Sequence, residues 1–370
     1  MSEPSGRLSP DVVLERIVRA VTAEVPTPSV WLVGSRAMAQ AVGSSDYDVV
    51  VVLNTFLVPI YLTRLKGIER RLSKELKLKI AINPLSTFRL KRARGNLFLF
   101  KAKREGKVIY GRDCLGELEP GGIAEMSVER LISLLFSAMK ELADGFDPGP
   151  EDTPDASTVA AQGAAKAVLF CSELHLMLAG CYETGGEQQR AALAGLCPSY
   201  PDCPGFDVDT FLVDLDLALR VRAGSPVADP VALWFRAREH AADLLLLLLR
   251  RESDSRDRDL ESLASRYFAR RRWSFPGNVR FFLLALLTKR GFLPASLLSP
   301  YWVEGRLRVA LLWLILAAKG DGSIDEEFLR RACKAIPGYS DTPHKGGASR
   351  WREVRRAIDG LWPAACPLMA

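Results

Sequence analysis

The chain has 370 residues, 48% of them hydrophobic, and a formal net charge of +6. This length suffices for two or three domains with substantial cores. The longest apolar run, residues 309–318, is far shorter than the roughly 20 residues that span a bilayer, so we expect no membrane helix. Residues 1–25 lack the apolar segment of a signal peptide, and we expect a cytoplasmic protein.

The first part of the chain alternates between helical and strand patterns. Apolar residues at helical spacing predict a helix over residues 9–24, and residues 31–33 predict a strand. A Gly-Ser turn at residues 34–35 follows, then a short helix over residues 36–41 and an apolar, strongly β-forming run at 49–53.

The alternation continues through the next sixty residues. A Lys- and Arg-rich helix is predicted over residues 59–76, and a third strand over 78–83 ends before a proline. A helix that ends at residues 101–105 and a short strand at 107–110 follow. This order predicts an α+β fold, in which a small mixed sheet has its helices on one side.

Two acidic residues open the apolar run that begins at Val49. On a strand, residues two apart point to the same face, so Asp46 and Asp48 present two carboxylates side by side. Such a pair favours a cation between the carboxylates, and Mg²⁺ prefers one or two carboxylates together with water and substrate phosphates. Gly34 lets the backbone approach a phosphate closely, and Ser35 offers a hydroxyl and an amide. An ordinary turn with capping aspartates is the alternative interpretation.

A Gly-Ser pair, separated by the ten residues 36–45 from an Asp-x-Asp that leads into an apolar strand, resembles the nucleotidyltransferase superfamily. That superfamily includes DNA polymerase β, CCA-adding enzymes and the minimal nucleotidyltransferases. Residues 96–113 also resemble the helix and short strand that commonly close such a domain. The likeness covers residues 8–118.

This resemblance implies a role for each residue of the pattern. Asp46 and Asp48 would hold Mg²⁺ or Mn²⁺ and act in catalysis, and Gly34 and Ser35 would bind the phosphates of a nucleoside triphosphate. Arg36 is assigned to the leaving pyrophosphate from its place beside the turn.

The sequence departs from the superfamily pattern at one point, because a third carboxylate usually lies on a neighbouring strand. The candidate positions are Ala81 and Asn83, and neither is acidic. Asn83 can offer a neutral oxygen to the metal but cannot act as a general base. Glu75 and Asp113 are the candidate substitutes.

Strand patterns nearly vanish after residue 120. Helical spacing predicts a helix over residues 125–142, a Pro-, Asp- and Gly-rich linker over 144–158, and further helices beyond. We therefore expect a nucleotidyltransferase-like domain followed by an all-α region of two domains, with boundaries at 1–120, 121–250 and 251–370.

Basic residues concentrate in one part of the chain. Residues 61–112 contain 16 Lys/Arg and 3 Asp/Glu, a local balance of +13 that leaves −7 for the remainder. Such a field attracts polyanions, so both a nucleoside triphosphate and a nucleic acid are candidate partners. A solvated basic face that aids solubility is the alternative.

The seven cysteines and three histidines show no zinc-binding spacing. Cys197 and Cys203 flank a Pro-rich loop, where they pair, bind a metal or remain free thiols of a reducing cytosol, which is the interpretation we favour. His175 and His240 lie in helical patterns and are expected in the core or on a helix face.

Together these features favour a metal-dependent nucleotidyltransferase that moves a nucleoside monophosphate from a triphosphate to an unidentified acceptor and releases pyrophosphate. The alternative is a catalytically degenerate protein on the same fold that binds a nucleotide or nucleic acid. A third interpretation is a regulatory protein whose helical region binds a protein partner. The Asp46 and Asp48 pair favours the first, whereas Ala81 and Asn83 favour the second.

Overall fold

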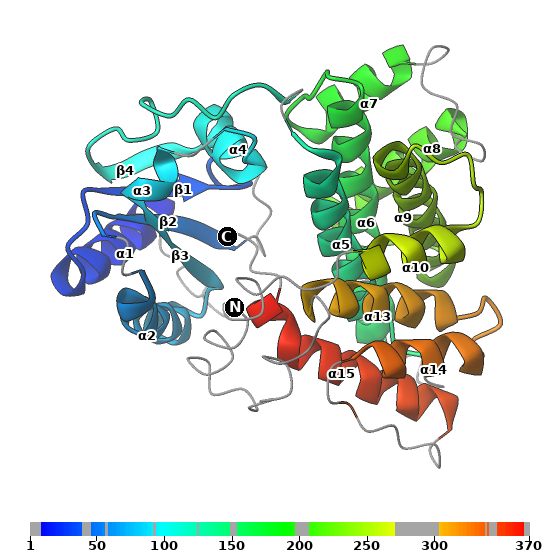
Figure 1. Cartoon of the computed structure of the whole chain (residues 1–370). Coiled ribbons are helices and arrows are strands. Elements are labelled where there is room, and N and C mark those ends of the chain that lie inside the picture. The colour runs from blue at the N-terminus through cyan, green and yellow to red at the C-terminus, as the bar shows by residue number, and fades with distance from the viewer. Residues whose placement is uncertain are drawn as a thin grey trace. The chain divides into compact units, whose positions relative to one another are not determined.

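A computed structural model of the protein describes residues 9–38, 46–55, 58–91, 94–123, 126–148, 154–196, 207–270, 303–336, 339 and 346–365. The chain splits into two compact units, which divide between Met126 and Ser127 (Figure 1). The division of the helical region into two domains at residue 250 stays a prediction, and helix α9 (Pro230–Ser253) runs across that position.

The first unit is built on a four-stranded mixed sheet with the strand order β3-β2-β1-β4. Strand β2 (Tyr47–Leu53) is antiparallel to β1 (Ser29–Val33) and parallel to β3 (Ile80–Ser86). Strand β4 (Lys107–Gly111) pairs antiparallel with the other edge of β1. The predicted small mixed sheet is confirmed.

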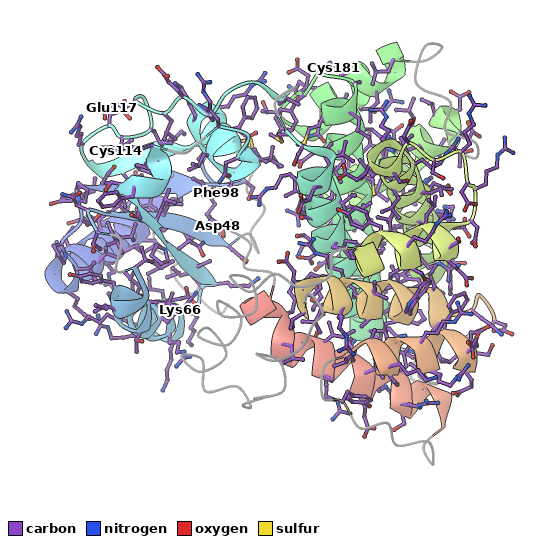
Figure 2. The ribbon with its side chains drawn as sticks, in the orientation of Figure 1. Asp48, Lys66, Phe98, Cys114, Glu117 and Cys181 are labelled. Atoms are coloured by element: carbon purple, nitrogen blue, oxygen red, sulfur yellow. The ribbon has the colours of Figure 1, made fainter. Side chains whose placement is uncertain are left out.

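Helices cover both faces of this sheet. Helices α1 (Pro10–Glu24) and α2 (Val58–Leu76) pack against one face, and α4 (Leu97–Glu105) packs against the other. Figure 2 labels Lys66 on α2 and Phe98 on α4, which lie on opposite sides of the strands. The prediction of helices on one side only is therefore wrong, because α4 contributes buried residues to a second core.

Strand β2 is buried on both faces, which explains its continuous apolar sequence. Val49 and Val51 belong to the core shared with α1 and α2, whereas Val50 and Val52 belong to the core on the α4 side. Side chains alternate along a strand, so a strand covered on both faces needs apolar residues at every position. Charged groups are thereby restricted to the start of β2.

Strand β3 continues through Pro84, beyond the predicted end at residue 83. β3 is an edge strand, and Pro84 pairs in register with Val51 of β2. Proline is tolerated at such a position because the missing N–H can face away from the neighbouring strand. The single-turn helix α3 (Thr87–Leu90) follows directly.

Over its described residues the second unit is helical apart from one short bridge between Ala318 and Ile324, which confirms the predicted all-α region. Besides α9, its described helices in chain order are α5 (Val128–Gly145), α6 (Pro154–Leu178), α7 (Gly186–Leu196), α8 (Val208–Arg222), α10 (Leu260–Arg270), α13 (Val303–Ala317), α14 (Glu326–Ala335) and α15 (Gly347–Ala365).

Helices α5 and α6 approach each other closely because glycines lie where they meet. A Cβ atom at Gly163 would lie 2.7 Å from the carbonyl oxygen of Glu141, so any side chain there would force the helices apart. The segment between the two helices is shorter than the predicted linker at 144–158, since α5 runs to Gly145 and α6 begins at Pro154.

The leucine-rich helices of the second unit supply its core. Leu244 and Leu248 of α9 are fully buried. Trp234 of α9 donates its indole N–H to the carbonyl oxygen of Leu142 on α5 at 2.8 Å and stacks on Phe146. Among the described helices, none combines the length and the apolar character that crossing a membrane requires.

A buried polar cluster joins α6, α8 and α9. Asp214 accepts hydrogen bonds from His240 at 2.9 Å and Arg236 at 2.8 Å, and Phe211 packs edge-on against both His240 and His175. Burial would raise the pKa of Asp214, but the hydrogen bonds from His240 and Arg236 hold it below its ordinary value. Burial lowers the pKa of His175 to about 3, so His175 is a neutral core residue at pH 7.

The buried His175 makes the stability of the second unit depend on pH. Its pKa is lower in the folded than in the unfolded chain, so the unfolded chain binds more protons between about pH 3 and 6.5. Stability therefore falls as the pH decreases through that range, by up to about 1.4 kcal/mol per pH unit.

A His175→Leu variant removes this contribution and should lose less stability than the wild type between pH 7 and pH 5. Native-state hydrogen exchange of α6 amides measures the difference, and the first unit serves as an internal control because its sequence contains no histidine. An identical pH dependence in both proteins would contradict the assignment of His175 to a neutral buried state.

Trp31 anchors β1 in the core on the α4 side. It is fully buried, and its indole N–H donates to the hydroxyl of Ser29 at 2.7 Å. Trp31→Ala should lower the opening free energy of β1 and β2 amides by about 3–5 kcal/mol in native-state hydrogen exchange. Ile60→Ala, at a side chain that is 59% exposed, should change it by less than about 0.5 kcal/mol. Equal losses in the two variants would contradict the core position of Trp31.

Candidate functional site

The turn that follows β1 begins at Gly34. Its φ of +75° lies in the left-handed region, which glycine adopts without strain. The amide of Ala37 donates to the carbonyl oxygen of Gly34 at 3.0 Å and closes a turn over Ser35 and Arg36. The described part of the predicted helix at 36–41, residues 36–38, is thus a turn, and residues 39–45 lie outside the described residues.

The carboxylate of Asp48 lies directly against this turn. The antiparallel register pairs Val33 with Asp48, so the end of β1 and the start of β2 lie side by side. A Cβ atom at Gly34 would lie 2.9 Å from Oδ2 of Asp48, which is closer than real Cβ contacts allow. The two halves of the predicted motif therefore lie side by side, and both the positive φ and this close approach favour glycine at residue 34. Figure 2 labels Asp48 on β2.

Strand β3 places no acidic residue beside this pair. The parallel register sets Ala81 opposite Asp48 and Asn83 opposite Val50. Asn83 thus lies on the same face of the sheet but two residues, about 7 Å, further along it. Its role as a metal ligand stays a prediction that the register does not favour.

Neither candidate substitute for the third carboxylate lies at this point. Glu75 forms an ion pair with Arg16 of α1 at 2.9 Å, on the face of the sheet opposite to Asp48. Asp113 follows β4, whose end pairs with Ser29 at the start of β1 and therefore at the far end of the sheet from Gly34. Its carboxylate accepts the amide of Gly116 at 2.8 Å and stabilises a turn there.

Lys79 is a site residue that the sequence analysis did not single out. Its ammonium lies 2.6 Å from Oδ2 of Asp46, and the two side chains are 75% and 29% exposed. Both residues immediately precede their strands, and the register pairs Tyr47 with Ile80. Parallel pairing therefore brings Asp46 and Lys79 together. The sequence could have indicated this contact, because each residue directly precedes one of two strands that follow each other in the chain.

Arg36 lies over the ring of Tyr47, with the guanidinium carbon 3.9 Å from the ring centroid. Such stacking of a cation on an aromatic face is attractive. Tyr47 belongs to the core shared with α1 and α2, whereas Asp48 points to the other face. The predicted contact of Arg36 with pyrophosphate would require the side chain to leave this ring.

Further cations lie at the same end of the sheet. Lys107 of β4 pairs in register with Leu32, one residue from the end of β1, and Lys74 lies in the last turn of α2. Both side chains are exposed. The basic region of the sequence thus contributes positive charge near the carboxylate pair, where it attracts anions.

The donors at the start of β2 fit one divalent cation. Asp46 and Asp48 would supply carboxylate oxygens, and Gly34 places no side chain beside Oδ2 of Asp48. Mg²⁺ completes its octahedron with water and substrate phosphates when a protein offers two carboxylates. Over the described ranges of the chain, no three His, Cys, Asp or Glu side chains gather in a group that could hold a metal ion without such help.

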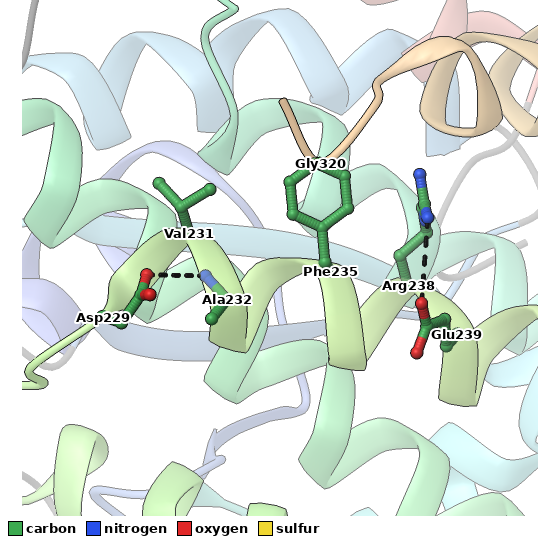
Figure 3. Close-up of a pocket in the computed structure, with 7 residues that line it drawn as sticks. All are labelled: Asp229, Val231, Ala232, Phe235, Arg238, Glu239 and Gly320. Atoms are coloured by element: carbon green, nitrogen blue, oxygen red, sulfur yellow. Dashed lines mark hydrogen bonds and ion pairs between the residues drawn. The ribbon is translucent and has the colours of Figure 1, made fainter. Parts of the chain in front are cut away.

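A pocket of about 500 Å³ lies in the second unit, at the start of α9 (Figure 3). Asp229 accepts the amide of Ala232 at 2.8 Å and thereby caps the helix. Arg238 donates to the carbonyl oxygen of Ala318, and its Nη2 atom lies 4.0 Å from Oε1 of Glu239. These polar groups serve the local structure, and the pocket contains none of the predicted site residues.

The cysteines give no metal centre in the described structure. Cys114, Cys171, Cys181 and Cys333 form no disulfide, and burial raises the pKa of Cys171 to about 12. The predicted alternatives for Cys197 and Cys203 lie outside the described residues.

The contact between Gly34 and Asp48 can be tested by adding one methyl group. Gly34→Ala adds a Cβ that collides with Oδ2 of Asp48 and strains a positive φ, at a cost of about 1 kcal/mol or more in folding stability. Because the carboxylate must move, we also expect about ten-fold weaker binding of Mn²⁺-tripolyphosphate in a calorimetric titration.

Gly67→Ala is the matched control, since a Cβ at Gly67 in α2 meets no atom within 4 Å. Alanine is favoured over glycine in a helix, so this variant should be slightly stabilised and bind normally. Normal binding by Gly34→Ala would contradict the proposed approach of the turn to Asp48.

Comparison with known proteins bears on the same part of the chain. A search of curated proteins gives no match. Residues 14–103 match the family model described as the nucleotidyltransferase domain, a range that covers most of α1, the sheet strands β1 to β3 and most of α4. The predicted resemblance is confirmed, and the N-terminal part of this chain carries a nucleotidyltransferase domain.

Proposed function

We propose that the first unit binds a nucleoside triphosphate with a divalent cation at Asp46 and Asp48 and transfers the nucleoside monophosphate to an acceptor. The contact of Gly34 with Asp48 is the single observation that carries this proposal. It places the Gly-Ser turn beside a carboxylate pair, and phosphoryl transfer depends on holding phosphate and charge in fixed positions.

The residues of the turn would hold the triphosphate. Without a side chain, Gly34 lets phosphate oxygens approach the backbone, and the hydroxyl and amide of Ser35 can donate to them. Asp46 and Asp48 would hold Mg²⁺ or Mn²⁺ through their carboxylates. The bound cation would neutralise phosphate charge and polarise the oxygens of the α-phosphate.

In the proposed reaction an acceptor oxygen forms a bond to the α-phosphorus. The bond from that phosphorus to the bridging oxygen of the β-phosphate breaks, and pyrophosphate leaves with the electron pair. The acceptor proton passes to solvent or to the departing phosphate, since Ala81 stands where a carboxylate base would face Asp48. In this proposal, the positioning of the acceptor and the α-phosphate contributes more to catalysis than a protein base does.

Ala81 also supports a second candidate function, binding of the nucleotide without transfer. Asp46 and Asp48 would then hold a nucleotide as a regulatory ligand. Nucleic acid at the basic region and a protein partner at the helical unit remain predictions for both functions, as does the cytoplasmic location.

Transfer of α-³²P from each of the four nucleoside triphosphates, with Mn²⁺ or Mg²⁺ and a cell extract, tests the first function. We expect label on an acceptor with the wild type, and a loss of about 100-fold or more in Asp46→Asn/Asp48→Asn. Asp113→Asn is the control, because this carboxylate lies at the far end of the sheet.

Two other outcomes decide between the candidates. Metal-dependent triphosphate binding that the double variant loses, without any transfer, would support the binding function instead. Equal transfer by the wild type and the double variant would exclude the proposed site.

A further inference from the structure

One cation beside the carboxylate pair is a side chain of the protein itself. Lys79 Nζ lies 2.6 Å from Oδ2 of Asp46, which is the distance of a charge-assisted hydrogen bond. The parallel pairing of β2 and β3 fixes this neighbourhood, because residues 46 and 79 each precede the first paired residues of their strands.

Strand β3 itself carries no charged side chain, and Lys79 immediately precedes it. Ala81 and Asn83 follow Lys79 at every second position, and Leu85 belongs to the core on the α4 side. An acidic residue at Ala81, opposite Asp48, would help to hold a second metal ion. The chain instead places positive charge beside Asp46.

The ammonium of Lys79 can exchange its contact with Asp46 for a contact with another anion. Lys79 is 75% exposed, and exposed ion pairs are weak because water screens them and the side chains lose freedom in forming them. The lysine stem is flexible, and its ammonium can turn to another anion without a change in the backbone. A divalent cation that binds Asp46 would compete with Lys79 for the same oxygen.

The triphosphate would then lie within reach of the displaced ammonium. Phosphate oxygens complete the coordination of a cation held by two carboxylates, so they lie next to Asp46 as well. An ammonium is a compact charge that commonly binds phosphates as a point charge.

We propose that Lys79 is the second cation of this site: it neutralises Asp46 in the free protein and binds the triphosphate once a single divalent cation occupies Asp46 and Asp48. This inference rests on the proposed function, because it assumes that both ligands bind at this carboxylate pair. It assigns phosphate binding to a residue outside the Gly-Ser and Asp-x-Asp motif.

The proposal predicts opposite effects on two ligands. Removal of the competing ammonium in Lys79→Ala should tighten the binding of Mn²⁺ alone by about two- to five-fold. The same variant should bind Mn²⁺-tripolyphosphate about five- to ten-fold more weakly, because a charged phosphate contact is lost. Electron paramagnetic resonance of free Mn²⁺ gives the first affinity and a stoichiometry of one, and calorimetry gives the second.

Two variants distinguish a specific contact of residue 79 with phosphate from a general effect of positive charge on binding. Lys79→Arg keeps a cation and should retain most of the tripolyphosphate affinity. Lys319→Ala is the matched control, because Lys319 forms a similar exposed ion pair with Asp325 at 3.2 Å in the second unit, and it should leave both affinities unchanged. Equal effects of Lys319→Ala and Lys79→Ala, or no effect of Lys79→Ala on either ligand, would overturn the proposal.

Asp46→Asn/Asp48→Asn distinguishes failure of this inference from failure of the proposed function. If the double variant loses Mn²⁺ binding while Lys79→Ala binds both ligands as the wild type does, only the role of Lys79 is refuted. If the double variant binds Mn²⁺ normally, the carboxylate pair is not the metal site and both proposals fall.

Discussion

The register of β2 between its two neighbours determines which side chains meet in the candidate site. β1 runs antiparallel to β2, so its end carries Gly34 to the carboxylate of Asp48. β3 runs parallel to β2, so the two strands start side by side. Asp46, which precedes β2, therefore forms an ion pair with Lys79, which precedes β3. A shift of either strand by one residue would move these groups to the opposite face and separate them.

Burial of β2 explains why the chemistry is confined to the end of the strand. Helices cover both faces of the sheet, and every position from Val49 to Leu53 is fully buried. An ionised carboxylate in that stretch would lose its hydration without compensation. Asp46 and Asp48 are half-buried, which leaves them in reach of solvent and ligands while the apolar part of the strand holds their backbone in place.

The charges at this end of the sheet balance each other only in part. One carboxylate faces a lysine, and the other lies against a glycine turn. Such an arrangement attracts both a divalent cation and the phosphates that it carries. The buried Asp214 of the helical unit shows the contrasting case, because His240 and Arg236 both donate to its carboxylate and hold it as part of the core.

Sequence patterns alone determined the four strands, the helical second part, the Gly-Ser turn and the carboxylate pair, because these depend on local periodicity and on residue types at short spacing. β3 continues through Pro84 because it lies at the edge of the sheet. Helix α4 packs on the second face of the sheet through contacts between residues far apart in the sequence. The position of Ala81 beside Asp48 and the pairing of Lys79 with Asp46 were decided only by tertiary structure. Residues more than thirty positions apart become neighbours through strand register, and no local pattern in the chain records that register.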